Sequence, residues 1–180
     1  MSARFEGSGD LTGLSLAAIA LALVATALVV RGVRPATKPN PQAQFSGLLS
    51  RYCSLWTAAA QADDPSKAAP LYAKDAGLVF FGLGDTEYKG WSAYGSGVKS
   101  TLLDNVMSLR FRPLGDLRVT RQGDFAWTTS DLQMAVTWEN GRSQRLDVEQ
   151  TAVWQNRGGH WLIVHEHLSS PALGAGRLGS

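Results

Sequence analysis

The sequence predicts an α+β domain in which helices come first and a curved antiparallel sheet follows. From Phe45 to about Met107 much of the apolar patterning has helical spacing, and from there to Ser169 the apolar period changes to two. The dipeptide Asn140-Gly141 separates two alternating runs, which is typical of a tight hairpin. Helices that precede a long antiparallel sheet are expected to pack on one of its faces.

An apolar stripe that repeats every three or four residues predicts the first helix. Its members are Phe45, Leu48, Leu49, Tyr52, Leu55, Trp56 and Ala59. The helix is expected to stop by Asp63-Asp64-Pro65. Three further elements follow: a helical piece over 66–72, a strand over 77–82 and a helix over 91–107. Gly95 and Gly97 weaken the last helix by about 1 kcal/mol each relative to alanine.

Alternating runs then predict the strands, which cover residues 107–112, 117–120, 125–139, 144–155 and 160–169. If the last hairpin turns over residues 156–159, Gln155 lies opposite His160. The more apolar face of that hairpin would then carry His165 and His167 into the interior of the domain, beside Gln150.

The amino-terminal part predicts a membrane segment. Residues 11–30 contain no charged side chain, and at about 1.5 Å per residue they could cross a hydrocarbon core of about 30 Å. We therefore expect one hydrophobic helix ahead of the domain, serving as a transmembrane anchor or a signal segment. The expected division of the chain is a tail over 1–10, the hydrophobic segment over 11–30, a proline-rich linker over 31–44, the folded domain over 45–171 and a flexible tail over 172–180.

The side of the membrane is left open by two opposing signals. Ala25-Thr26-Ala27 resembles the small-residue pattern near a signal peptidase site, whereas Arg31, Arg34 and Lys38 after the segment favour a cytoplasmic domain. We favour a membrane-anchored or exported protein on the periplasmic side.

Charge and cysteine content limit the function classes. The chain has 17 basic and 15 acidic residues, and the surplus of +2 falls within residues 1–44. The rest of the chain has no net charge, so it lacks the surplus of lysine and arginine that nucleic-acid binding requires. The one cysteine, Cys53, cannot form an internal disulfide, and it lies close to the apolar stripe of the first helix, as a small buried side chain would.

Several segments together resemble a known family: LYAKDA, YKGWSAY, DFAWTTSDLQM and the ending VEQTAVWQNRGGHWLIVHEHLSSP. They are similar to the SnoaL-like branch of the nuclear transport factor 2 (NTF2) superfamily, and the ending resembles the association domain of calcium/calmodulin-dependent protein kinase. The resemblance covers about residues 45–171. It implies a cone of helices on a curved sheet that encloses a pocket, commonly as a homodimer through the outer face of the sheet. It implies no particular reaction, because members of the superfamily differ in function.

Seven residues are candidates for a site in that pocket. His165 and His167 could exchange protons near neutral pH, and Asp131 is a carboxylate in the middle of a largely apolar strand. These three are the catalytic candidates, with a structural role for the histidines and a solvent-exposed Asp131 as alternatives. The candidates for ligand contact are Tyr52, Trp56, Trp91 and Gln150. No metal site and no cofactor is expected, since no ligand spacing, Walker, Rossmann or G-x-S-x-G motif is present.

Three hypotheses on function follow. In the first, the tethered or exported domain binds a small, largely apolar molecule in its pocket. In the second, it is an acid-base enzyme of the isomerase or dehydratase type that acts on a cyclic or unsaturated compound. In the third, it is a non-catalytic assembly or docking subunit of a membrane complex. A pocket lined by aromatic residues favours the first, two converging titratable groups the second, and a filled interior the third.

Overall fold

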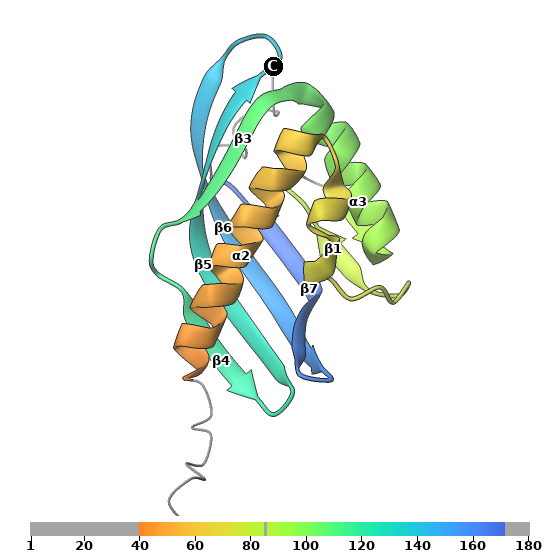
Figure 1. Ribbon diagram of the computed structural model, residues 1–180, viewed down its shortest axis with the longest axis vertical. Helices are drawn as coiled ribbons and strands as arrows, with labels where there is room; N and C mark the ends of the chain where they lie inside the picture. Colours follow the sequence, from red (N-terminus) through yellow and green to blue (C-terminus); the bar gives the residue numbers. More distant parts are fainter. Residues whose placement is uncertain (1–39, 85, 172–180) are drawn as a thin grey trace, which may run out of the picture. The chain divides into compact units, whose positions relative to one another are not determined.

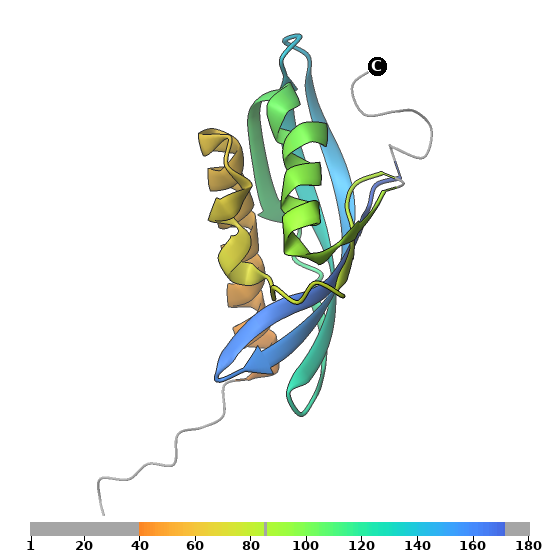
Figure 2. The ribbon, with the colours of Figure 1, turned by 90° about the vertical axis from the view of Figure 1, so that its right-hand side faces the viewer.

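The computed structural model describes residues 40–84 and 86–171, which form two helices packed on one face of a seven-stranded sheet (Figures 1 and 2). The helices are α2 (Pro41–Ala62) and α3 (Gly90–Thr101). The strands are β1 (Val79–Phe81), β2 (Glu87–Lys89), β3 (Val106–Pro113), β4 (Arg118–Gln122), β5 (Phe125–Trp138), β6 (Ser143–Arg157) and β7 (His160–Ser169). Short 3₁₀ turns are η1 (Pro65–Lys67), η2 (Ala69–Leu71) and η3 (Leu103–Asn105). The predicted α+β fold is confirmed.

Helix α2 begins earlier than the expected domain start at Phe45. Proline occupies its first position, where the missing N–H is not needed, and the Asn40 side chain accepts a 3.0 Å hydrogen bond from the Gln42 amide. The prolines of the predicted linker therefore do not exclude helix at Pro41. The helix ends at Asp63, whose φ of 49° lies in the left-handed region. Most of the predicted apolar stripe is buried: Phe45, Leu49, Tyr52, Cys53, Trp56 and Ala59.

The sheet has the order β2-β1-β7-β6-β5-β3, with β4 also paired to β5. All pairs are antiparallel except β1 with β7, so the sheet is mixed rather than wholly antiparallel. A parallel pair needs a long connection, and the chain from β2 to β6 lies between these two strands in sequence.

The last hairpin is tighter than predicted and contains a β-bulge. The turn is Gly158-Gly159, with φ of 59° and 88°, so Arg157 and not Gln155 pairs with His160. The register then shifts, because Trp154 pairs with Ile163 whereas Val153 pairs with His165. The extra residue, Val164, turns every later side chain of β7 to the opposite face.

Among the described residues, no helix is long and apolar enough to span a bilayer. The predicted hydrophobic segment, the two tails and all of the predicted linker up to residue 39 lie outside these residues.

Candidate functional site

An apolar cleft lies where α2 and α3 meet the sheet. Its volume is about 30 Å³, which is room for about one water molecule. The lining residues are Tyr52, Trp56, Gly82, Leu83, Tyr88, Tyr94, Val98, Thr101, Leu102, Phe111 and Leu168. Leu83, Tyr88 and Val98 are half-buried and Thr101 is exposed, so these four residues mark the solvent side of the cleft.

A completely buried carboxylate, Glu166, lies close to this cleft. The hydroxyl groups of Tyr72 and Tyr94 each donate a 2.8 Å hydrogen bond to its Oε2 atom. The Gln150 amide donates a 2.6 Å hydrogen bond to Oε1. Tyr94 is the direct link between the two features, because its ring lines the cleft while its hydroxyl contacts Glu166.

Further hydrogen bonds extend this arrangement across the core. The indole N–H of Trp56 donates to the Tyr72 hydroxyl at 3.0 Å, and Ser130 Oγ donates to Gln150 Oε1 at 3.1 Å. We call this set the Glu166 network: Trp56, Tyr72, Tyr94, Ser130, Gln150 and Glu166. The carboxylate and the Gln150 side chain both have partners, so the desolvation cost of burying them is offset.

Aromatic packing fixes the two tyrosine hydroxyls in place. The Tyr94 ring stacks on Phe80 with a centroid distance of 5.2 Å, and the Tyr72 ring lies 4.6 Å from Trp91. Phe80 also pairs with Glu166 across the parallel strands β1 and β7. Rings packed in this way cannot rotate freely, so the hydroxyl groups stay directed at the carboxylate.

Burial raises the pKa of Glu166 above its ordinary value, because the charged form loses its hydration. Hydrogen bonds from Tyr72, Gln150, Tyr94 and Tyr52 oppose this effect but do not cancel it. The pKa values of these three tyrosines are raised, first by burial and then by the charge of Glu166. The phenols therefore remain protonated donors, and the carboxylate is the proton acceptor of the network.

The four predicted ligand-contact residues have different positions. Tyr52 and Trp56 line the cleft. Gln150 is buried next to it and binds Glu166 instead. Trp91 is half-buried and packs on Tyr72, with the Lys74 ammonium 4.1 Å from its ring centroid.

The predicted inward orientation of the two histidines is wrong, and the bulge at Val164 is the physical reason. His167 is exposed, and His165 is half-buried with its Nδ1 donating a 2.8 Å hydrogen bond to the Val79 carbonyl. Both imidazole rings form T-shaped contacts with the Phe81 ring, at centroid distances of 5.9 Å for His165 and 5.6 Å for His167. Neither histidine lines the cleft.

Asp131 lies on the exposed face of β5, so it is not a carboxylate over an apolar cavity. Its backbone N–H donates a 3.0 Å hydrogen bond to Asp116, and it pairs across the strands with Glu149. The Asp116 carboxylate is the main cause that raises the pKa of Asp131. Asp131 and the histidines therefore do not converge with the cleft.

The sequence reasoning missed Glu166, Tyr72 and Tyr94. The sequence of β7 contains a signal for Glu166. Trp161 and Ile163 are at odd-numbered positions, whereas the apolar residue further along the strand, Leu168, is at an even-numbered position. Such a change of apolar phase within one strand indicates a bulge, and it would have placed Glu166 inside. No group of three metal-ligating side chains comes together within the part of the chain that the structure describes.

Comparison with known families matches residues 51–173 to the SnoaL-like domain. An NTF2-like superfamily protein from Salmonella enterica serovar Typhimurium is 17% identical, with a TM-score of 0.62 over 72% of this chain and 93% of that chain. The LinA-type3 hexachlorocyclohexane dehydrochlorinase of Novosphingobium barchaimii is 15% identical, with a TM-score of 0.57, and the match covers 72% of this chain and 88% of that chain. A protein from Xanthomonas campestris described as a calcium/calmodulin-dependent protein kinase II association domain is 21% identical, with a TM-score of 0.59. The match covers 77% of this chain and 91% of that chain. At these identities the likeness shows the fold. The comparison with curated proteins gives no match.

Proposed function

Because the chain belongs to the SnoaL-like domain family, we propose that it binds a small, largely apolar molecule in the apolar cleft. The observation that supports this is the lining itself, which consists mainly of aromatic and aliphatic side chains, with Thr101 at the solvent side of the cleft. Burial of an apolar ligand yields about 25 cal/mol per Å² of apolar surface, and a few polar groups then set its orientation.

The volume of about 30 Å³ sets a condition on binding. A ligand larger than one water molecule must displace side chains on the solvent side of the cleft. Leu83 and Tyr88 are suited to this, because both are half-buried, Leu83 in the connection between the short strands β1 and β2 and Tyr88 on β2. The buried wall formed by Tyr52, Trp56 and Phe111 would stay in place.

Acid-base catalysis is a second candidate, favoured by the contact between Tyr94 and Glu166. In such a reaction the Tyr94 oxygen would take a proton from a substrate carbon while its own proton passes to Glu166 Oε2 over the 2.8 Å hydrogen bond. Glu166 itself does not line the cleft, so every proton would travel through Tyr94. This indirect route makes binding the better supported function.

The tether is the second part of the proposal. The uncharged residues 11–30 would anchor or export the chain, and the proline-rich stretch before Asn40 would hold the domain away from the bilayer surface. The Ala25-Thr26-Ala27 pattern supports placement of the domain on the periplasmic side.

Native mass spectrometry of the detergent-extracted full chain tests the binding function. The wild type should retain a small molecule, and toluene, a neutral aromatic probe, should raise its melting temperature. Val98→Phe fills the cleft and should abolish both effects. Val119→Phe, at a half-buried position outside the cleft, is the matched control and should preserve them. Equal responses of the two variants to toluene would contradict the proposal.

A further inference from the structure

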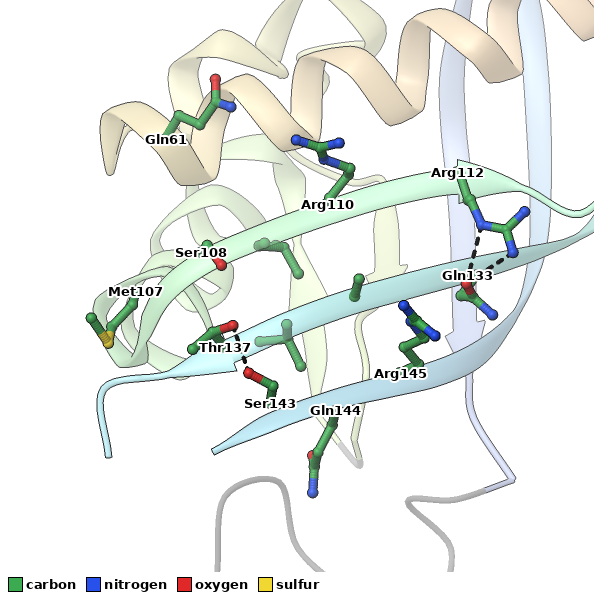
Figure 3. Close-up of a pocket in the computed structure, with 13 residues that line it drawn as sticks. Gln61, Met107, Ser108, Arg110, Arg112, Gln133, Thr137, Ser143, Gln144 and Arg145 are labelled. Carbon is green, nitrogen blue, oxygen red and sulfur yellow. Dashed lines mark hydrogen bonds between the residues drawn. The ribbon is translucent and has the colours of Figure 1, made fainter. Parts of the chain in front are cut away.

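A second hollow lies over strands β3, β5 and β6, with Gln61 of α2 at one margin (Figure 3). Its volume of about 920 Å³ is within the range of small-molecule sites, and it is open to solvent. Its exposed or half-buried sheet residues, such as Arg110, Ala135 and Arg145, alternate with the buried side chains that face the helices. The hollow therefore lies on the outer face of the sheet, away from the apolar cleft, and an inference about it does not depend on the proposed ligand of the cleft.

Two arginines line this hollow from opposite sides of the central strand β5. Arg110 of β3 and Arg145 of β6 both pair with Ala135 of the central strand β5, so the three residues form one row. Neighbouring strands are about 4.8 Å apart, which places the two backbones about 10 Å from each other. The small Ala135 side chain between them leaves room for a ligand group that both guanidinium groups can reach.

The next row adds further donors. Arg112 donates through Nε and Nη2 to the Gln133 Oε1 atom, at 3.1 and 2.9 Å. Because this oxygen is occupied, the Gln133 amide nitrogen is its free end and can donate to a ligand. Figure 3 shows Arg110, Arg112, Gln133 and Arg145 around the same hollow. Ser108, Thr137 and Ser143 also line the hollow, and the hydroxyls of the last two share a 3.0 Å hydrogen bond. The other lining residues are Gln61, Met107, Leu109, Val136 and Gln144.

The lining of the hollow is basic, and among the described residues the nearest carboxylate in its rows is Asp147, opposite Gln133. No carboxylate belongs to its lining, and neither Arg110 nor Arg145 forms an ion pair with a described residue. We propose that the hollow binds a small anion with two or more carboxylate or phosphate groups. Arginine suits this chemistry, because its planar fork of N–H groups matches both carboxylate and phosphate oxygens.

The neighbouring part of the sheet limits the ligand to a small molecule. On the exposed face of β5 and β6, Asp147 lies opposite Gln133 at the end of the second row, and Asp131 and Glu149 form the row after it. These carboxylates would repel a long polyanion laid along the strands, whereas a compact anion fits within the basic end. The site thus favours a di- or tricarboxylate, or a phosphate-bearing metabolite, over nucleic acid.

Isothermal titration calorimetry of the full chain in a neutral detergent tests this proposal, with citrate and pyrophosphate as the carboxylate and phosphate probes. At least one probe should bind, and the stronger of the two identifies the preferred group. Arg145→Gln and Arg110→Gln should each weaken that binding at least tenfold, and added salt should weaken it further. Arg118→Gln is the matched control, because it removes the same charge from the same face outside the hollow and should change the affinity less than twofold.

Three outcomes would overturn the proposal. Failure of both probes to bind at millimolar concentration is the first, and equal weakening by Arg118→Gln and Arg145→Gln is the second, since it indicates only general charge attraction. The third comes from sedimentation. If the wild type is a dimer that both Arg145→Gln and Glu149→Gln dissociate, the arginines bind the acidic residues of a second copy and not a small anion.

Discussion

The Tyr94 hydroxyl donates a 2.8 Å hydrogen bond to the buried carboxylate of Glu166, and the ring of the same residue lines the apolar cleft. Tyr94 therefore links the apolar cleft directly to the buried carboxylate. A change in the protonation of Glu166 alters the hydrogen bonds that Tyr94, Tyr72 and Gln150 donate to it.

Tyr94→Phe removes this hydrogen bond while the ring keeps its stacking on Phe80. We expect the unfolding free energy at pH 7 to fall by about 1 to 3 kcal/mol, because a buried ionisable group loses a donor. Urea denaturation measures the change. Tyr88→Phe is the control, since Tyr88 lines the cleft without donating to Glu166, and a comparable loss there would contradict the assignment.

The raised pKa of Glu166 predicts the direction of a pH dependence. Between the ordinary pKa of about 4.5 and its higher pKa in the native state, Glu166 holds a proton in the folded chain that the unfolded chain has released. The contribution of Glu166 to the unfolding free energy is therefore fully present below the ordinary pKa. It is lost as the pH rises through the pKa of the native state. The unfolding free energy of the wild type should therefore decrease with pH relative to that of Glu166→Gln.

Glu166→Gln should fold, because the Gln150 amide can reverse. Tyr72 and Tyr94 would then donate to the new amide oxygen, and the new amide nitrogen would donate to the Gln150 oxygen. Chemical denaturation of both proteins from pH 4 to pH 9 gives the comparison. Parallel curves over the whole range would show that Glu166 keeps an ordinary pKa.

A substitution at Gly97 of α3 should alter the cleft without removing the hydrogen bond between Tyr94 and Glu166. A methyl group at this position would lie 2.0 Å from the Tyr88 ring, so the ring must move away from α3. Gly97→Ala should strengthen the helix by about 1 kcal/mol in intrinsic propensity and yet change toluene binding. Gly47→Ala, in α2 with open space around it, is the control and should leave binding unchanged. The short distance also explains why a glycine occupies this helical position, since any larger residue would clash with the Tyr88 ring.

The fold could be predicted from the sequence because its main signals are local. The apolar stripe from Phe45 to Ala59 and the Asn140-Gly141 turn each act over a few residues, and both are confirmed. The site depended instead on one inserted residue, Val164, and on long-range pairing of β1 with β7. Neither feature follows from strict alternation, which predicts the histidines in the interior in place of Glu166. Tyr52 and Trp56 do line the cleft, since the predicted helix fixes the face on which they lie.

The bulge leads to a prediction for the residues on the outer side. His167→Ala and Asp131→Asn should leave toluene binding unchanged, because neither side chain lines the cleft. His167 is exposed, so its replacement should change the unfolding free energy by no more than about 0.5 kcal/mol. Loss of binding in either variant, with the fold intact by near-ultraviolet circular dichroism, would place the functional site on the outer face.

Cys53 provides a last test of the packing of α2 on the sheet. It is the one cysteine of the chain, it is 4% exposed, and burial raises the pKa of its thiol to about 12. At pH 8 the thiolate, which is the reactive form, is then only about one part in ten thousand of the native population. We expect Ellman's reagent to react with the folded chain no faster than the chain unfolds, and at once in 6 M guanidinium chloride. The rate should rise in parallel for variants that destabilise the domain, such as Tyr94→Phe. Rapid reaction of the native wild type would mean that α2 separates from the sheet far more often than global unfolding allows, and the cleft between them would then be too mobile to select a ligand by shape.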